Sequence, residues 1–235
     1  MMALLCAHPR LAGLDAETKF FFRRNFLDLN LDAVPRKEMT GLLRAARDKV
    51  DLFDRIGAFV KTQYGATRFV EKTPKHALRL DFLGRHYPNA HFVFMIRDPR
   101  DGYLSVTHKG GIWQSTVPRY TELWRRSLNA YYAAKTSAVS IVLVRYEDLC
   151  RTPEAELSRV MAFLGEAFDA AQLDREVYGN TRMRLRQGLE RVAQDISSSS
   201  IGGWKRMLDR ESARDIEKEL CSEMRELGYL MEANK

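Results

Sequence analysis

The chain has 235 residues, of which 45% are hydrophobic, and this is enough to bury one sizeable core. We therefore expect a single domain over residues 1–235. Its 38 Lys and Arg residues outnumber 31 Asp and Glu residues, which gives a net charge of +7. That excess favours a polyanionic ligand or an acidic acceptor, although a solvated basic face explains it equally well.

The cysteine content and the length of the apolar runs narrow the possible classes of protein further. The cysteines, Cys6, Cys150 and Cys221, are odd in number and widely spaced, so neither a disulfide framework nor a metal site is predicted. The apolar residues 1–5 lack a preceding basic region and are too short for a signal peptide. No run reaches the roughly 18 apolar residues of a membrane span. We expect a soluble, cytoplasmic protein.

Helical and strand-like patterns alternate along the chain. Apolar residues recur every three or four positions over residues 38–64, which predicts helix there. Short runs rich in β-branched and aromatic residues predict strands at Arg68–Val70, His91–Ile96 and Ser140–Arg145. Further helices are predicted at Lys75–His86, Pro99–His108, Thr121–Ala134, Pro153–Leu164 and Glu211–Leu227.

The strand and helix patterns together predict an α/β fold with a parallel sheet flanked by helices. Residues 91–96 and 140–145 are almost continuously apolar, as in strands covered on both faces. A capping side chain followed by proline precedes three predicted helices, at residues 73–74, 98–99 and 152–153. In such a doubly wound sheet, ligands gather at the carboxyl ends of the strands.

The first chemically informative residues are Glu71 and Lys72, directly after a predicted strand. A carboxylate beside an ammonium at the mouth of a sheet can serve as a base with a nearby electrophilic group. The alternative is an ordinary surface ion pair at a helix start, which is common and weak.

A second candidate site begins at Arg97, which closes a predicted strand and precedes a predicted helix. Its guanidinium offers a fork of donors to a phosphate, and the helix amino terminus adds partial positive charge. Ser105 lies in the second turn of that helix, and Lys109, one turn beyond Ser105, can add a further positive charge to the predicted phosphate site. The alternative is that Arg97 pairs with Asp98 or Asp101.

These two segments, in this order and spacing, resemble the sulfotransferases that use 3′-phosphoadenosine 5′-phosphosulfate (PAPS). The Val-Glu-Lys-Thr-Pro string of residues 70–74 is similar to that of heparan sulfate 3-O-sulfotransferases and bacterial relatives, and the motifs also resemble those of tyrosylprotein sulfotransferases. The resemblance implies that Glu71 is the catalytic base and that Lys72 contacts the sulfuryl group. The Arg-Asp-Pro string of residues 97–99, with Ser105 eight positions after its arginine, resembles the family's 3′-phosphate site.

Two downstream strings extend the resemblance in the expected order. Residues 145–149, Arg-Tyr-Glu-Asp-Leu, resemble a segment whose tyrosine approaches the adenine, which assigns that role to Tyr146. Residues 202–205 resemble the late Gly-x-Trp-Lys segment, whose loop closes over the nucleotide. The residues implied there are Gly203, Trp204 and Lys205.

The chain departs from the family pattern at two points. Many members carry Arg-Lys-Gly ahead of the late tryptophan, whereas serines stand here, so Ser199 and backbone amides are expected to hold phosphate. Some members use histidine as the base, which makes His76 an alternative to Glu71. We favour Glu71, because His76 falls within a predicted helix and can simply face solvent.

The first phosphate-binding element of the family is absent from residues 1–68. Members start their core with a strand and a Ser-Gly-Thr-type loop that cradles the 5′-phosphosulfate. Residues 1–13 resemble the helix that follows that loop, so we expect the missing strand and loop directly upstream of Met1.

The resemblance implies a sulfotransferase of P-loop NTPase-like fold that moves the sulfuryl group of PAPS to a hydroxyl or amine, without a metal. Adenosine 3′,5′-bisphosphate is the implied product, and a small molecule, carbohydrate or lipid rather than a nucleic acid is the expected acceptor. Residues 20–30 and 109–120, which mix aromatic and basic side chains, are expected to meet it. The alternatives are a kinase-like nucleotide-binding enzyme and a non-catalytic remnant that binds the bisphosphate weakly or not at all.

Overall fold

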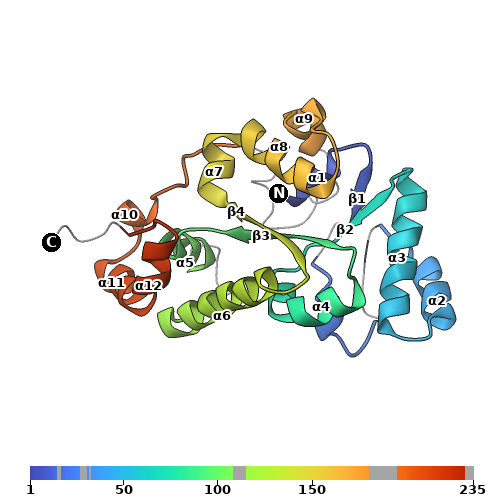
Figure 1. Ribbon diagram of the computed structural model, residues 1–235, viewed down its shortest axis with the longest axis horizontal. Helices are drawn as coiled ribbons and strands as arrows, with labels where there is room; N and C mark the ends of the chain where they lie inside the picture. The colour runs from blue at the N-terminus through green and yellow to red at the C-terminus, as the bar shows by residue number, and fades with distance from the viewer. Residues whose placement is uncertain (15–16, 27–30, 32, 108–114, 180–194, 231–235) are drawn as a thin grey trace. The chain divides into compact units, whose positions relative to one another are not determined.

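The computed structural model describes residues 1–14, 17–26, 31, 33–107, 115–179 and 195–230 (Figure 1). These residues form two compact units. The first contains residues 1–79 and 165–195, and the second contains residues 80–164 and 196–235. Each unit holds one pair of parallel strands among its helices, so the predicted α/β class with parallel strand pairing is confirmed.

The first unit is built on two short parallel strands. β1 (Leu11–Gly13) pairs with β2 (Arg68–Val70), and Leu11 lies opposite Arg68. The helices of this unit are α1 (Met2–Cys6), α2 (Arg36–Ala45), α3 (Lys49–Tyr64) and α9 (Arg175–Tyr178), with 3₁₀ helices η1 (Phe20–Phe22), η2 (Pro74–Arg79) and η3 (Ala170–Gln172). The Gln172 side chain donates to the Leu4 carbonyl at 3.1 Å, which joins the late segment of the unit to α1.

Helix α3 supplies much of the first unit's core. Its buried residues Leu52, Ile56 and Val60 recur every four positions; Ile56 and Val60 belong to the predicted apolar pattern, and Leu52 does not. The predicted helical stretch 38–64 is divided into α2 and α3, because the Asp48 side chain accepts the amide of Asp51 at 2.9 Å and begins a new helix.

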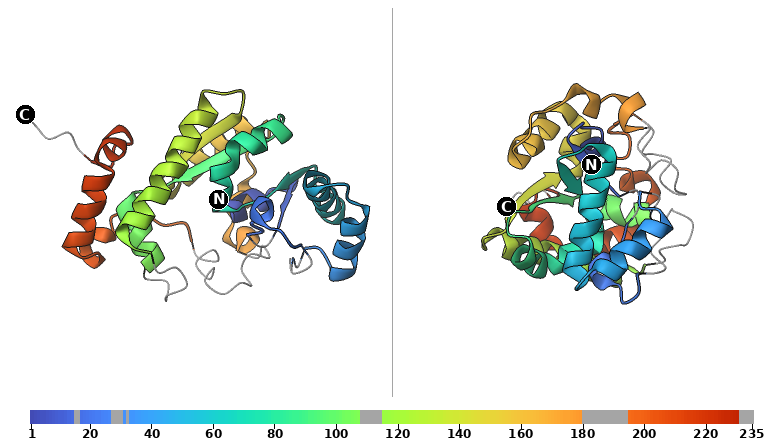
Figure 2. Two further views of the ribbon diagram at one scale, coloured as in Figure 1. Left: turned by 90° about the horizontal axis from the view of Figure 1, so that it is seen from below. Right: turned by 90° about the vertical axis from the view of Figure 1, so that its right-hand side faces the viewer.

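The second unit is built on a longer parallel pair. β3 (His91–Ile96) pairs with β4 (Ser140–Arg145) in a register that sets His91 opposite Ser140. The helices of this unit are α4 (Leu80–His86), α5 (Pro99–Thr107), α6 (Val117–Lys135), α7 (Tyr146–Arg151), α8 (Pro153–Leu164), α10 (Trp204–Met207), α11 (Arg210–Glu219) and α12 (Cys221–Glu226). Helices α6 and α8 lie on opposite faces of the pair (Figures 1 and 2).

Burial along β3 and β4 is less complete than predicted. Ile96 packs with Leu128 and Tyr131 of α6, and Val144 is fully buried. Helices therefore cover both faces as predicted, but Met95 is 36% exposed, so this cover is incomplete.

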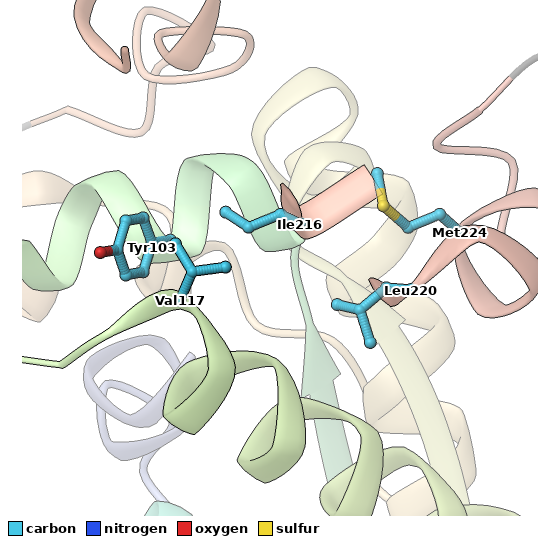
Figure 3. Packing of buried hydrophobic residues seen from close by; sticks show 5 residues of the cluster. All are labelled: Tyr103, Val117, Ile216, Leu220 and Met224. Carbon is cyan, nitrogen blue, oxygen red and sulfur yellow. The ribbon is translucent and has the colours of Figure 1, made fainter. Parts of the chain in front are cut away.

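A second hydrophobic cluster of this unit joins α5 and α6 to the C-terminal helices (Figure 3). Its buried members are Tyr103, Val117, Ile216, Leu220 and Met224. The helix predicted over residues 211–227 is divided in two at Leu220, which is completely buried.

One of the three predicted helix caps forms as expected. The Asp98 side chain accepts the amide of Arg100 at 2.9 Å, as a cap of α5 does. The hydroxyl of Thr152 instead donates to the Asp148 carbonyl, and that of Thr73 donates to a carboxylate of the candidate site below. Those two hydroxyls therefore connect to the preceding residues rather than to the following helix.

Three further observations concern the described ranges. None of their helices is both long and apolar enough to cross a membrane. No group of three or more His, Cys, Asp or Glu side chains among these residues could hold a metal ion. The three cysteines, Cys6, Cys150 and Cys221, are free thiols.

Candidate active site

Glu71, the predicted base, directly follows β2 in the first unit and is tied into a buried hydrogen-bond cluster. Its Oε1 accepts from the hydroxyls of Thr18 at 2.8 Å and Thr73 at 2.6 Å. Its Oε2 lies 2.9 Å from Nδ1 of His76. The Glu71 side chain is only 9% exposed, so this carboxylate is not one half of a surface ion pair.

The surroundings of Glu71 favour its ionised form. Burial raises the pKa of this carboxyl, but the hydrogen bonds from His76, Thr73 and Thr18 more than offset that effect, and the pKa lies below its usual value. Glu71 is therefore a carboxylate at neutral pH. A carboxylate offers about four acceptor positions, so the three donors found among the described residues leave one position, on Oε2, for a further proton.

His76 lies in η2 and is buried, which corrects the expectation that it sits in an α-helix and faces solvent. The amide of Phe21 donates toward its Nε2 at 3.4 Å. Because the Glu71 carboxylate can only accept, the Nδ1 of His76 carries the proton that the two share. His76 therefore holds Glu71 in place, and its other nitrogen faces the backbone.

Lys72 points to a different partner from Glu71. Its ammonium lies 2.6 Å from Oε1 of Glu17, and both side chains are 36% exposed. The surface ion pair considered as an alternative therefore exists, but between Lys72 and Glu17. Such exposed pairs are weak, at about 0–1 kcal/mol, so Lys72 can leave this partner at small cost.

Some of the aromatic residues that were expected to contact an acceptor are buried in the core, and others lie at the surface. Phe20 and Phe21 are buried against Phe53, so they belong to the core. Phe22 is exposed, and its ring stacks on that of His76 at a centroid distance of 6.1 Å. The Arg79 guanidinium lies over the same Phe22 ring at 5.1 Å.

Arg97, the predicted phosphate ligand, follows β3 in the second unit. Its guanidinium lies 4.5 Å from the centroid of the Tyr146 ring and donates to the Ser200 carbonyl at 2.7 Å. The nearest approach to Asp101 is 4.0 Å, at the limit of an ion pair, and Asp98 pairs with Arg100 instead. Among the described residues, the buried Nε of Arg97 has no hydrogen-bond partner.

The residues 196–203, which we call the late loop, are fixed beside Arg97 by side chains of other elements. The hydroxyls of Ser200 and Tyr146 lie 2.8 Å apart. The carboxylate of Asp101 accepts the amides of Gly202 at 2.7 Å and Trp204 at 2.9 Å. The structure thus brings three predicted nucleotide-binding regions together: the end of β3, the start of α7 and the late loop.

Other predicted residues of this region have different surroundings. The hydroxyl of Ser199 pairs with that of Ser197 at 2.8 Å, so Ser200 is the loop serine that meets Tyr146. Gly203 precedes α10, which begins with Trp204 and Lys205. Ser105 lies half-buried in α5, and Lys109 falls outside the described residues.

Arg100 and Asp101 are the residues that sequence reasoning missed as parts of this region. Arg100 is buried, lies over the Trp204 ring at 3.8 Å from its centroid, and pairs with Asp98 and Glu217. A sequence signal existed, because both residues belong to the first turn of α5, directly after the Arg-Asp-Pro string. Sequence analysis considered Asp101 only as an ion-pair partner for Arg97.

Comparisons with known proteins agree on one family. A family profile described as the sulfotransferase family matches residues 1–170. A putative protein-tyrosine sulfotransferase of Caenorhabditis briggsae is 23% identical over 195 residues, which cover 77% of this chain and 69% of that protein. Protein-tyrosine sulfotransferase 1 of Danio rerio is 24% identical over 185 residues, 74% of this chain and 52% of that protein.

A bacterial relative and two solved structures support the same assignment. The ω-hydroxy-β-dihydromenaquinone-9 sulfotransferase Stf3 of Mycobacterium bovis is 26% identical over 147 residues, 55% of this chain and 37% of that protein. The sulfotransferase domain from the curacin biosynthetic pathway aligns with a TM-score of 0.56 and 17% identity, covering 93% of this chain and 91% of that one. The sulfotransferase domain of the Synechococcus PCC 7002 olefin synthase aligns with a TM-score of 0.57 and 18% identity, covering 92% of this chain and 87% of that one.

The two structures, at these identities, show that the fold is that of sulfotransferase domains. The family profile covers more than two thirds of the residues. This chain therefore belongs to the sulfotransferase family.

Proposed function

We propose that the protein, with residues 1–235 serving as one catalytic domain, moves the sulfuryl group of PAPS to a hydroxyl or amine of an acceptor. The observation that carries this proposal is Glu71, a buried carboxyl at a strand end that has three hydrogen-bond partners among the described residues, in a member of the sulfotransferase family. A hydroxyl is the acceptor group we favour. The names of two relatives, a protein-tyrosine and an ω-hydroxy-menaquinone sulfotransferase, both describe hydroxyl-bearing acceptors.

The residues around Arg97 fit a phosphorylated nucleotide. The Nε of Arg97 is buried without a partner in the described part of the chain, and a phosphate oxygen is a strong acceptor for such a donor. Tyr146 already stacks on this guanidinium. The residues proposed to hold the nucleotide are Arg97, Ser105, Lys109, Tyr146, Ser199, Gly203, Trp204 and Lys205.

The chain's own residues would contribute to transfer as follows. Glu71 accepts the proton of the acceptor hydroxyl. At the same time the oxygen of that hydroxyl forms a bond to sulfur, and the bond between sulfur and the phosphate oxygen of PAPS breaks. His76 keeps the Glu71 carboxylate oriented through Nδ1. Lys72 leaves Glu17 and offsets negative charge on the sulfuryl group. PAPS supplies the sulfuryl group when bound, and adenosine 3′,5′-bisphosphate is what remains.

The test compares Glu71→Gln with wild type in two assays. Transfer is measured with radiolabelled PAPS and a panel of phenol, alkyl alcohol, sugar and amine acceptors, and binding is measured by titration calorimetry with adenosine 3′,5′-bisphosphate. We expect the variant to lose roughly 100-fold or more of the transfer rate, the usual contribution of a general base, while binding the bisphosphate as wild type does. Glu38→Gln, at an exposed carboxylate of α2, is the control and should change neither.

Three outcomes would contradict the proposal in different ways. Unchanged turnover in Glu71→Gln would refute the role of that residue. Bisphosphate binding by wild type without transfer to any acceptor would favour a non-catalytic remnant. Magnesium-dependent hydrolysis of ATP would favour a kinase-like enzyme.

A further inference from the structure

We propose that Asp101 is a positioning residue, which anchors the late loop so that Arg97, Tyr146 and the loop serines are arranged for the nucleotide. The part that concerns the nucleotide rests on the proposed function, whereas the anchoring itself does not. Nothing in the sequence pattern assigns this role, because Asp101 and the late loop are about a hundred positions apart in the chain.

The contact is made by both oxygens of one buried carboxylate. Oδ2 of Asp101 accepts the amide of Gly202 at 2.7 Å, and Oδ1 accepts the amide of Trp204 at 2.9 Å. The residue is 1% exposed, so water does not compete for these bonds. Hydrogen bonds from amides to an ionised acceptor are stronger than neutral ones, and burial strengthens them further.

The backbone of the loop is shaped to present these two amides together. Gly202 has a φ of +70°, in the left-handed region that glycine adopts without strain. The turn places two amides on one side of the chain, which is the arrangement that binds anions in many proteins. Here a carboxylate of the protein itself occupies that arrangement.

This occupancy changes what the late loop can offer a ligand. The sequence led us to expect that amides of this loop hold phosphate, yet the amides of Gly202 and Trp204 are committed to Asp101. The loop meets Arg97 through the Ser200 carbonyl and Tyr146 through the Ser200 hydroxyl. The anchor therefore acts by fixing Ser200 against those two side chains.

The anchoring is tested by hydrogen–deuterium exchange read by NMR. In wild type, the amides of Gly202 and Trp204 should be protected. Asp101→Asn keeps the shape of the side chain but has only one acceptor oxygen and no charge, so exchange at these amides should rise roughly tenfold or more. Asp215→Asn, at an exposed position of α11, is the matched control.

Nucleotide binding is measured on the same proteins by calorimetry with adenosine 3′,5′-bisphosphate. We expect Asp101→Asn to weaken binding about tenfold, because the unanchored loop must be ordered when the ligand binds. A side chain with only a general structural role would leave the affinity of the folded protein for the bisphosphate unchanged, which separates the two explanations.

The possible results distinguish failure of the anchor from failure of the proposed function. If the amides of Gly202 and Trp204 in the wild-type protein exchange as fast as those of an exposed loop, the proposal that Asp101 anchors the loop is wrong, and this result needs no variant. Faster exchange in Asp101→Asn with unchanged bisphosphate affinity would overturn its role in nucleotide binding. Protected amides in a wild-type protein that binds no bisphosphate would support the anchor and contradict the proposed function.

Discussion

The guanidinium of Arg100 lies over the ring of Trp204, 3.8 Å from its centroid, and both residues belong to the region that surrounds the late loop. The same guanidinium donates twice to Asp98, once to Glu217 and once to the Tyr229 carbonyl. One buried side chain therefore joins the start of α5 to α10, α11 and the residues after α12. A planar group with five donors suits this position, and an ammonium does not.

The first prediction concerns the stability that this network gives the second unit. Arg100→Met should lower the free energy of unfolding by about 3–5 kcal/mol, because it leaves the Asp98 carboxylate buried without its cation. Urea unfolding followed by circular dichroism measures the change. The control is Arg85→Met, whose partner Asp81 and own side chain are each 70% exposed, and the expected change is within about 0.5 kcal/mol. Equal losses in the two variants would show that the Arg100 network contributes no more than a surface pair.

A second prediction uses two helical glycines whose surroundings differ. A methyl group at Gly102, in α5, would overlap the hydroxyl of Tyr120, and the Tyr120 ring cannot move freely because it packs edge-on against Tyr103. Gly102→Ala should therefore destabilise the protein by about 1–3 kcal/mol, as overpacking does. A methyl group at Gly41, in α2, would meet nothing within 4 Å, so Gly41→Ala should stabilise by up to about 1 kcal/mol through helix propensity.

Thermal unfolding of the two glycine variants gives the sign directly. The melting temperature should fall for Gly102→Ala and rise for Gly41→Ala. A rise for both would mean that helix propensity, and not the contact with Tyr120, decides the outcome at Gly102.

The strands show how far a sequence pattern determines local structure. β2, β3 and β4 lie where the apolar runs predicted them, because β-branched and aromatic residues specify strands within a few positions. β1 was not predicted, since Leu11–Gly13 is short, lacks β-branched residues, and forms only by pairing with β2 far along the chain. The division of residues 38–64 was also missed, although Asp48 is a cap signal, because the apolar periodicity continues across it.

For the candidate site, too, some features follow from the sequence and others do not. The position of Glu71 at a strand end followed from the sequence, whereas its contacts with Thr18 and His76 depend on a loop and a 3₁₀ turn that periodicity does not describe. The amides that Asp101 binds lie about a hundred positions later in the chain. Side chains that join distant segments follow from tertiary packing, and one sequence carries no direct signal of it.

The last prediction concerns the pH dependence of the Glu71 cluster. Burial raises the pKa of Glu71, but the hydrogen bonds from His76, Thr73 and Thr18 bring it below the ordinary value of 4.5 in the folded state. A carboxyl whose folded pKa is depressed stabilises the protein above its unfolded pKa, and that contribution is lost as the pH falls through the folded pKa. Wild type should therefore be more stable than Glu71→Gln at pH 6, by roughly 1.5–3 kcal/mol for hydrogen bonds to a charged group. The difference should shrink as the pH falls below about 4.5, the unfolded reference value. Urea unfolding at a series of pH values measures it, and Glu38→Gln should show no such trend. A difference that grows toward acid pH would mean that the folded pKa of Glu71 is raised, and that the cluster holds a protonated carboxyl instead of a ready base.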